Sequence, residues 1–573
     1  MKLVCPSQRK PNQSGQVLVQ AILYSGILGI ACFAMLEVSQ NRVQSAYNRS
    51  DNNEAFYHAE NALNWGMQRI ADENAPQGRY MASDRTLALS YFNTLTNSSA
   101  SLFHEAWLNV IDHPSGVVNM FLVTASARVG NRTRTLQAAV HKNPPSQVFD
   151  YEYFLNNWGW WWGSSITGNG DNRANWDFDF RSGPAVNGSV IANGDIESDG
   201  TPIDPLSGSV PLNGLAGANP VAYLHDGAPR LTMPNLKDLS YYQQQAAANS
   251  GTLKIGTNLM ISAVHTNTVK PGMCLVGTTA NPITIDGPVV IPGDVVIKGV
   301  ITGIGTLYVG GSLYVAGDVS YKNGPSFSSP PELMTPENRD AWVKNNIDGN
   351  KDLVAFAVRE SIFGGDVNST EWKNRCYEPS AYGLKNVGDE SGLGADGIPE
   401  TPDDGIRYLD TNGDGNADSA WYDADGDATV DRNYVYSSDI QMSATRASKI
   451  SGYPDGATPG VPAGYETLAS NNFNTLSGIF YCNHAVAMRS TKSGLVASGA
   501  LICRDEAIVF TGSCRFNYDS RIHSRYSNDP NRYVDLGLPV ANKISVRSLV
   551  EAAPVEGFVS TVYNGSSYGY LGD

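Results

Sequence analysis

Charged residues are scarce in this chain, and positive ones are the scarcer. Only 17% of the 573 residues are charged, and 40 Lys and Arg stand against 56 Asp and Glu, giving a formal charge of −16. A nucleic-acid-binding protein needs a basic surface that displaces counterions, so this balance argues against that class. The 57 Gly and 30 Pro favour turn-rich β structure. The length predicts about two to four domains.

Cysteine is also rare, and its spacing argues against one class of site. None of the seven Cys forms a C-x-x-C pair of the kind that holds zinc or does redox chemistry. In an exported chain, a disulfide could join Cys503 to either Cys514 or Cys482. Because the five cysteines beyond the N-terminal region are an odd number, buried thiols are the favoured interpretation. These five are Cys274, Cys376, Cys482, Cys503 and Cys514.

The longest uncharged run lies near the N-terminus. Residues 17–36, VLVQAILYSGILGIACFAML, include no charged side chain. A helix of about 20 apolar residues matches the thickness of a bilayer's hydrocarbon core. Lys2, Arg9 and Lys10 precede this run and place the start of the chain on the cytoplasmic side. A secretory signal peptide would end in a small-residue cleavage site, whereas here a helical pattern continues to about residue 70. We therefore expect a membrane-spanning helix.

The helical pattern beyond the span has one small, apolar face. Its members are Val43, Ala46, Ala55, Ala59, Ala62, Leu63 and Gly66. A membrane helix that continues into a long amphipathic helix is typical of a pilin stalk. A plain signal anchor is the alternative.

Three stretches resemble PilX-type minor pilins of type IV pili. They are SGQVLVQAILYSGILGI at residues 14–30, AFYHAENALNWG at 55–66 and MFLVTASARVGNRTRTLQAAVHKN at 120–143. The resemblance implies that a prepilin peptidase cuts between Gly15 and Gln16 and that the new amine is methylated. It also implies partnership with other pilin or pseudopilin subunits, and a closing hairpin with its turn at Gly130 and Asn131.

Two positions depart from the pattern of major pilins. Those proteins begin the mature chain with Phe and carry Glu at its fifth position, whereas this chain has Gln16 and Gln20. The neutral Gln20 removes a membrane-buried charge that would be costly without a partner. Tip subunits of type II secretion pseudopili share that absence. The departure favours a minor component over a bulk filament subunit.

A six-residue repeat occupies residues 283–320. One apolar column consists of Ile283, Val289, Val295, Ile301, Leu307, Leu313 and Val319, and a glycine column consists of Gly287, Gly293, Gly299, Gly305, Gly311 and Gly317. A second apolar column consists of Ile285, Ile291, Ile297, Val309 and Val315, and fails at Gly303. Apolar residues two apart form a strand with one buried face, and Gly supplies the corner. This period predicts a β-solenoid.

Weaker rungs suggest that the solenoid is long and interrupted. Gly188, Gly194 and Gly200 keep the period, and residues 494–520 alternate in the same manner. We expect one solenoid from about residue 165 to about residue 525, with residues 325–470 projecting as an insertion.

The repeat also leaves other classes of protein open. A left-handed β-helix acyltransferase would need a general base such as His beside its strands, and the repeat contains none. A membrane-anchored β-helix enzyme acting on polysaccharide is the stronger alternative, although no compact group of carboxylates with Arg or Lys stands out on the rungs. A bactofilin-like scaffold is a third, opposed by the membrane-type N-terminus.

The chain's acidity is concentrated between residues 389 and 431. This stretch holds thirteen Asp and Glu and a single basic residue, Arg407. Its sequence DTNGDGNAD starts as an EF-hand-like loop does, and DADGDATVD follows it, although Trp421 replaces the closing Glu. A solvated acidic loop is the alternative to a Ca²⁺ site. The candidate ligands are Asp410, Asn412, Asp414, Asn416, Asp418, Asp423, Asp425 and Asp427.

An aromatic patch lies where the two predicted parts of the chain join. Residues 149–165, FDYEYFLNNWGWWWGSS, hold Trp158, Trp160, Trp161 and Trp162. Clustered Trp can stack on sugars, which makes surface glycans a candidate partner. Large aromatic residues more often cap a solenoid core or fill an interface, and that interpretation is favoured here.

These features together predict an α+β pilin-like module, with a long membrane-spanning helix and a small sheet, joined to a predominantly β, β-solenoid (β-helix) domain with an irregular insertion. The expected function is structural, in the assembly of a pilus or secretion filament or in adhesion, and no catalytic residue or organic cofactor is predicted. The chain should be anchored in the inner membrane, with its bulk in the periplasm or at the cell surface. The expected boundaries are 1–15 leader, 16–72 membrane and stalk helix, 73–147 pilin-like β module, 148–324 first part of the solenoid, 325–470 acidic insertion and 471–573 solenoid completion with the C-terminal tail.

Overall fold

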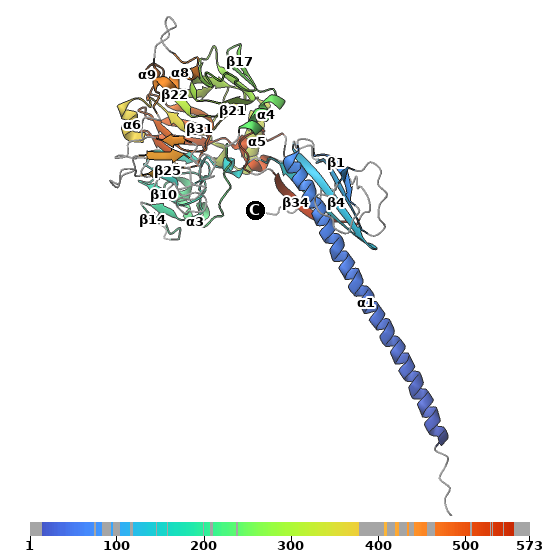
Figure 1. Cartoon of the computed structure of the whole chain (residues 1–573). Helices are drawn as coiled ribbons and strands as arrows, with labels where there is room; N and C mark the ends of the chain where they lie inside the picture. Colours follow the sequence, from blue (N-terminus) through green and yellow to red (C-terminus); the bar gives the residue numbers. More distant parts are fainter. Residues whose placement is uncertain are drawn as a thin grey trace, which may run out of the picture. The chain divides into compact units, whose positions relative to one another are not determined.

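The chain is described from a computed structural model. The described residues are 14–73, 76–82, 93–94, 104–114, 119–144, 146–156, 159–198, 200–206, 210–236, 239–376, 406–409, 419–422, 432–434, 441–454, 464–504, 507–527, 529, 531–541 and 544–554. They form a long N-terminal helix followed by mostly β structure (Figure 1). The chain divides into two compact units. The helix–sheet unit comprises Met1–Lys142 and Ile544–Asp573, and the stack unit comprises Asn143–Lys543.

Helix α1, Ser14–Asp72, has two halves with different surroundings. At a rise of about 1.5 Å per residue it is roughly 90 Å long, and the sheet covers only its C-terminal part (Figure 1). The buried residues of that part, Ala55, Ala59, Ala62, Leu63 and Ile70, recur at helical spacing on one face. The predicted face is thus confirmed from Ala55 to Gly66. Val43 and Ala46, which were assigned to the same face, are exposed, because no other element of the described chain reaches them.

The sheet of this unit is antiparallel and has the strand order β2-β1-β3-β4-β5-β34. The strands are β1 (Gly78–Ala82), β2 (Asn93–Thr94), β3 (His104–Asp112), β4 (Met120–Val129), β5 (Arg132–Lys142) and β34 (Ile544–Ala552). Strands β4 and β5 form the predicted hairpin, with Val129 opposite Arg132. The two-residue loop is possible because Gly130 takes a φ of 56°, as primed hairpin turns require.

The last strand of this sheet corrects a predicted boundary. Strand β34, expected in the C-terminal tail of the solenoid part, pairs instead with β5, and Ile544 lies opposite Lys142. The entire stack unit is therefore inserted in sequence between two adjacent strands of the antiparallel sheet. This pairing satisfies the outer edge of β5, and the long separation of the two strands in sequence hides it from any local pattern.

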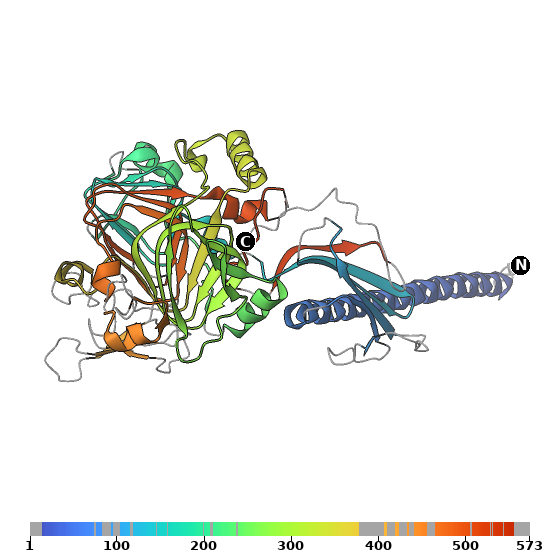
Figure 2. The ribbon, with the colours of Figure 1, turned by 90° about the horizontal axis from the view of Figure 1, so that it is seen from above.

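The stack unit consists mainly of parallel strands, which run side by side in Figure 2. Their pairings arrange them in three rows. Long strands turn a corner and belong to two rows. The first row consists of β19 (Ile283–Ile291), β20 (Val295–Thr302), β22 (Leu313–Tyr321), β29 (Thr475–Cys482), β31 (Leu495–Cys503), β33 (Cys514–Tyr518), β8 (Ile166–Asn169) and β11 (Ala185–Val186).

The second row begins with an antiparallel strand and is otherwise parallel. It consists of β16 (Thr252–Ile255), β19, β21 (Ile304–Val309), β23 (Leu353–Val358), β29, β31, β6 (Tyr153–Leu155), β9 (Asn172–Ala174), β12 (Val190–Ala192) and β15 (Leu224–His225). Strand β17 (Asn258–Ser262) pairs with β16 in a hairpin.

The third row is divided between two sheets. Its larger part consists of β28 (Ile450–Ser451), β18 (Gly272–Gly277), β20, β22, β24 (Ile362–Gly364), β30 (Val486–Arg489) and β32 (Ala507–Phe510). Its smaller part is a separate four-stranded sheet of β7 (Gly159–Trp162), β10 (Phe178–Arg181), β13 (Ile196–Ser198) and β14 (Thr201–Pro202).

The six-residue repeat sets the most regular coil. Ile283 lies opposite Ile301, and Val295 lies opposite Leu313, so one coil of the stack takes three hexads. All members of both predicted apolar columns are fully buried. The second column fails at Gly303 because a Cβ there would lie 2.3 Å from the carbonyl oxygen of Ile285.

Outside this block the coils are irregular. The structure therefore does not contain the clear, uniform solenoid that the repeat predicts. Strand β21 pairs with β23 in the register Ile304 to Leu353, and β24 pairs with β30 in the register Ile362 to Val486. These coils are far longer in sequence than three hexads, because segments leave the stack and return to it. The predicted insertion 325–470 also needs correction, since β23 and β24 form a coil of the stack. Their apolar sequences, LVAFAV and IFG, fill the core as the hexads do.

The chain enters the stack in its middle. The first coils, from β6 to β13, run toward one end of the stack. The segment that contains α4 then leads to the other end of the stack. From there the chain winds back until β31 pairs with β6 and β33 pairs with β8. The remaining described elements of the stack unit lie outside the rows. One of them is a three-stranded sheet of β25 (Ile406–Leu409), β26 (Ser419–Tyr422) and β27 (Arg432–Tyr434). The others are the short helices η2 (Gln147–Asp150), α2 (Gly214–Ala218), α3 (Pro220–Tyr223), α4 (Ser240–Ala248), η3 (Pro331–Leu333), α5 (Pro336–Asp348), α6 (Thr370–Cys376), α8 (Ala444–Ser448), α9 (Tyr465–Leu468), η4 (Ser520–Ile522) and η5 (Ser524–Tyr526).

Candidate functional site

The predicted calcium ligands all lie outside the described residues. This applies to Asp410, Asn412, Asp414, Asn416, Asp418, Asp423, Asp425 and Asp427. Elsewhere, the described part of the chain contains no group of three or more His, Cys, Asp or Glu that could hold a metal ion. Calcium binding by the acidic insertion therefore stays a prediction.

The predicted processing residues lie at the start of α1. Gly15 and Gln16 follow its first residue, Ser14, and Gln20 belongs to the same helix. Among the described residues, α1 is the one helix long and apolar enough to cross a membrane. Its exposed apolar side chains include Ile22, Leu28 and Phe33. The structure thus supports a membrane anchor by length and composition, while cleavage after Gly15 stays a prediction.

The described cysteines form no disulfide, and five of them are buried. Cys274, Cys376, Cys482, Cys503 and Cys514 all lie in the core, whereas Cys32 is exposed on α1. Burial raises the pKa of the Cys274 thiol to about 12, far from the range of reactive thiolates. The favoured interpretation of buried thiols is confirmed for these residues.

The aromatic patch is split between the core and the surface. Trp161 is 4% exposed and stacks on Phe516 with ring centroids 5.6 Å apart. Trp160 and Trp162 alternate with it on β7 and point to the other face, where Trp162 is 52% exposed. Their rings are tilted by 49° with centroids 6.5 Å apart, so they do not form a flat row. Trp158 lies outside the described residues.

A cleft of about 290 Å³ lies beside these tryptophans, between β7 and β32. We call it the β7–β32 cleft. None of the described residues that line it is charged, and they are Tyr153, Trp160, Trp161, Trp162, Gly163, Ile166, Ala507, Ile508, Val509, Phe510, Thr511, Cys514 and Phe516. The lining combines aromatic rings with aliphatic side chains and suits an uncharged ligand.

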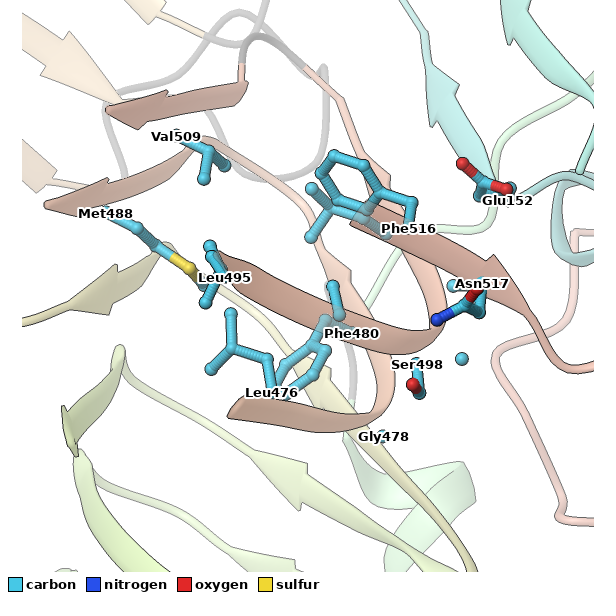
Figure 3. Close-up of a pocket in the computed structure, with 14 residues that line it drawn as sticks. Glu152, Leu476, Gly478, Phe480, Met488, Leu495, Ser498, Val509, Phe516 and Asn517 are labelled. Atoms are coloured by element: carbon cyan, nitrogen blue, oxygen red, sulfur yellow. The ribbon is translucent and has the colours of Figure 1, made fainter. Parts of the chain in front are cut away.

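A second, smaller cavity lies inside the stack, and one end of it is polar. In Figure 3, Glu152 and Asn517 lie at one end, and Met488 and Val509 lie at the other. It has about 20 Å³ of space for the centre of a water-sized molecule, which is room for about one water. Sequence reasoning missed Glu152, because a lone Glu before a strand carries no local signal of burial.

Glu152 is a buried acid in an apolar setting. It is 1% exposed, and neither carboxyl oxygen accepts a hydrogen bond of normal geometry within the described residues. Gly168 and Gly170 make room for it, since a Cβ on either would lie 2.7–2.8 Å from a carboxyl oxygen. Burial raises the pKa of Glu152 well above its ordinary value, and Asp171 and Glu332 add to this effect, while the Asn169 N–H opposes it. The acid is therefore neutral well above pH 4.5.

Charged side chains gather where the first and last segments of the stack unit meet. The backbone N–H and the hydroxyl of Ser524 each donate to Asp150, both at 2.6 Å. Glu332 accepts from Arg339 at 2.8 Å and from the Ser520 hydroxyl at 2.7 Å. These bonds connect η2, η3, α5, η4 and η5, and so hold the entering and leaving segments together.

This cluster contains the residue types of a nucleophilic triad but not its geometry. Ser524 donates to Asp150 and not to an imidazole, and Nδ1 of His523 accepts from the backbone N–H of Arg525 at 3.1 Å. Burial lowers the pKa of His523 to about 2, helped by the positive charges of Arg525 and Arg339. A general base at neutral pH needs a pKa near 7. The arrangement is that of a structural clamp.

Comparisons with known proteins identify no family for this chain. No family model and no curated protein matches the chain. Among solved structures, the competence-associated pilin ComZ from Thermus thermophilus matches with 10% identity over 88% of this chain and 98% of that chain, at a TM-score of 0.25. Similarity at this level does not establish a shared fold.

Proposed function

We propose that this protein is a membrane-anchored, pilin-like subunit that acts structurally in the assembly of a type IV pilus or related secretion filament, or in surface contact. PilX-like minor pilins are the class that its N-terminal sequence resembles. The proposal assigns no catalytic role to the chain. The expected partners are other pilin or pseudopilin subunits and a prepilin peptidase.

The division of α1 is the observation that carries this proposal. One uninterrupted helix presents exposed apolar residues from Ile22 to Val43 and then packs a face of small residues on an antiparallel sheet. A secretory signal would be cleaved from the folded unit, and a plain anchor needs no packed extension. An apolar half-helix that is continuous with a folded domain suits a subunit held first in the membrane and then against neighbouring subunits.

The stack unit would be the part displayed by such a subunit. We propose that it is an interrupted β-solenoid, supported by the three-hexad register of the repeat and by three rows of mainly parallel strands. Its acidic insertion would bind Ca²⁺ through Asp410, Asp414 and their neighbours. Such extracellular sites are weak, with a Kd on the order of 10⁻⁴ to 10⁻³ M.

Processing by a prepilin peptidase tests the proposal most directly. The full chain is co-expressed with the peptidase, and the mature N-terminus is determined by mass spectrometry. We expect a chain that begins at Gln16, and no cleavage in a Gly15→Leu variant. An uncut wild-type chain would identify a plain anchor, and a cut downstream of residue 36 would identify a secretory signal.

Calcium binding is tested separately, by isothermal titration of the full chain in detergent with CaCl₂. We expect the heat of binding to disappear in an Asp410→Ala/Asp414→Ala variant. It should persist in an Asp204→Ala/Asp226→Ala variant, which removes the same charge from described loops of the stack unit. Equal heats of Ca²⁺ binding in the two variants would show that this loop does not hold the site.

A further inference from the structure

Strand β34 forms one edge of the sheet in the helix–sheet unit (Figure 1). It is nine residues long and pairs with β5 on one side. On its other side no strand of the described chain pairs with it. Within the described residues, its hydrogen bonds are those to β5 and to the Arg134 side chain. A free edge of this length presents unpaired N–H and C=O groups that can template another strand.

One face of β34 continues the apolar core under α1. Val546 lies opposite Val140, and Leu549 lies opposite Ala138. Both β5 residues belong to the cluster that packs against α1, and residues directly opposite one another share a face of the sheet. Val546 and Leu549 are nevertheless 42% and 49% exposed. A strand added beside β34 would therefore bury apolar surface on this face.

The other face is polar and holds a positive charge without a counterion. Ser545 lies opposite the buried His141, and a bulge between Val546 and Ser548 leaves Arg547 outside the ladder. Bulges re-aim side chains. The positive charge of Arg547 helps to lower the pKa of His141, so the guanidinium lies near this face. Arg547 forms no ion pair with a described residue, and its Nε is buried without a hydrogen-bond partner among them.

The charge of this edge is opposite to that of the whole chain. Strands β5 and β34 carry Arg132, Arg134, Lys142 and Arg547 against one acid, Glu551, whereas the formal charge of the chain is −16. Glu551 already pairs with Arg134. A second copy of β34 would therefore bring another Arg547 and no free carboxylate. Charge complementarity favours a different segment, which is acidic.

We propose that the outer edge of β34 binds an extended, acidic segment of a partner protein, which adds a strand to the sheet. Main-chain hydrogen bonds to β34 would supply affinity, and alternate side chains would supply specificity. Apolar side chains on one face of the segment would cover Val546 and Leu549. A carboxylate on its other face would pair with Arg547. This inference goes beyond the proposed function, because it names the chemistry of a partner at a site distant in sequence from the membrane anchor.

A synthetic strand serves as the probe. The nonapeptide TVTVEVTVT, with both ends blocked, carries Val on one face and Glu among Thr on the other. It is added to the full chain in detergent, and hydrogen exchange of residues 544–552 is followed by mass spectrometry. We expect slower exchange of the amides that do not bond to β5. The Kd should be about tenfold lower than for the same peptide with Gln or Lys in place of Glu.

Strand β17 is the matched control edge within the same chain. Among the described strands it has a ladder with β16 alone. It is uncharged, and its Leu259 and Met260 are 57% and 44% exposed. A peptide that adds to any free edge would protect residues 258–262 as well as residues 544–552. We expect protection of β34 and none of β17.

Variants at the bulge test the role of charge. Arg547→Gln should remove the difference in Kd between the Glu and Lys peptides, and Arg547→Glu should reverse their order. Arg515→Glu is the control, because Arg515 is an exposed residue of β33 in the other unit, and it should keep the wild-type order. Unchanged exchange of β4 amides in each variant shows that the helix–sheet unit is folded.

Three outcomes would overturn the assignment. Equal Kd values for the Glu, Gln and Lys peptides would mean that the edge does not select an acidic segment. Slow exchange of all β34 amides in the peptide-free chain would mean that the edge is already covered, by a second copy if dilution removes the protection and by this chain itself if it does not. No protection by the Glu peptide would mean that the bulge and its charge keep other strands away. Because the chain is used uncut, failure of cleavage after Gly15 leaves these results unaffected.

Discussion

The two units of this protein build their sheets in opposite ways. In the helix–sheet unit, β3, β4 and β5 follow one another as antiparallel neighbours, and among the described strands β34 is the one long-range addition. In the stack unit the main rows are mostly parallel, and their partners range from Ile283 with Ile301 to Asn169 with Asn517. Local pairings are formed at little entropic cost, whereas distant ones must close long loops first. The first unit can therefore be read from sequence more easily than the second.

The units also differ in what fills their interiors. The helix–sheet unit depends on one face of α1, where small residues allow a close approach to the sheet. Both units bury polar side chains, among them Glu105 and His141 in the helix–sheet unit, but in the stack unit such side chains also link successive coils. Asn169 donates to Asn517 at 2.9 Å and accepts from Asn187 at 3.0 Å, which links three coils by side-chain amides. Such bonds matter because an unsatisfied buried amide is costly. Substitutions should therefore destabilise the two units for different reasons.

The largest effect is expected at Arg521 in the stack unit. This residue is fully buried, pairs with both carboxyl oxygens of Asp519, and donates at 2.8 Å to the carbonyl oxygens of Lys351 and Asp352. Arg521→Met would leave the Asp519 charge buried alone and should cost about 3–5 kcal/mol. Urea unfolding followed by hydrogen exchange in β29 and β31 measures this loss. Adding Asp519→Leu should recover part of it, and a double variant no more stable than the single one would contradict the ion-pair account.

The next largest effect is a loss of stability of the helix–sheet unit in acid. Burial, helped by Arg547, lowers the pKa of His141 to about 4 from 6.5. Between these values the unfolded chain binds more protons than the folded one, so stability falls as the pH drops from 7 to 4, by at most about 3 kcal/mol. Exchange rates of β4 and β5 amides should show this loss, and a His141→Gln variant should show less of it. An identical slope in that variant would assign the loss to other groups.

A moderate effect is expected where α1 touches its sheet. A Cβ on Gly66 would lie 2.9 Å from side-chain carbons of both Leu108 and Val123. Gly66→Val should therefore cost about 1–3 kcal/mol through overpacking, measured as faster exchange in β3 and β4. Gly26→Val is the control on the same helix, because a Cβ there meets nothing within 4 Å. Equal behaviour of the two variants would mean that the helix is not packed at Gly66.

The smallest effect is expected at an exposed ion pair of the stack unit. Lys344 and Asp348 are 2.7 Å apart on α5, and their side chains are 51% and 58% exposed. Lys344→Met should change the free energy of unfolding by about 0.5 kcal/mol or less, and added salt should remove the difference. A loss comparable to that of Arg521→Met would show that burial does not decide the strength of ion pairs here.

The elements with a periodic sequence pattern were predicted correctly, and those without such a pattern were missed. Helix α1 and both hexad columns follow from spacing alone, because each pattern repeats within the element that it specifies, whereas the hairpin of β4 and β5 was expected from the resemblance to PilX-type minor pilins. Strands β23 and β24 were assigned to the insertion, since two short apolar runs flanked by other structure carry no period. Glu152 and Arg521 were missed because nothing near them in sequence marks a polar residue that the fold buries.

The sequence by itself determined a long helix with an apolar first half, a block of hexads with two apolar columns, and an aromatic patch before it. Tertiary structure alone decided that β34 completes the first sheet, and that the coil around β6 and β33 is assembled from the two ends of the stack unit. It also decided that Trp161 enters the core and stacks on Phe516. The physical reason is that periodic patterns fix which face of an element is buried, whereas the partner that buries it is chosen by contacts between residues far apart in the chain.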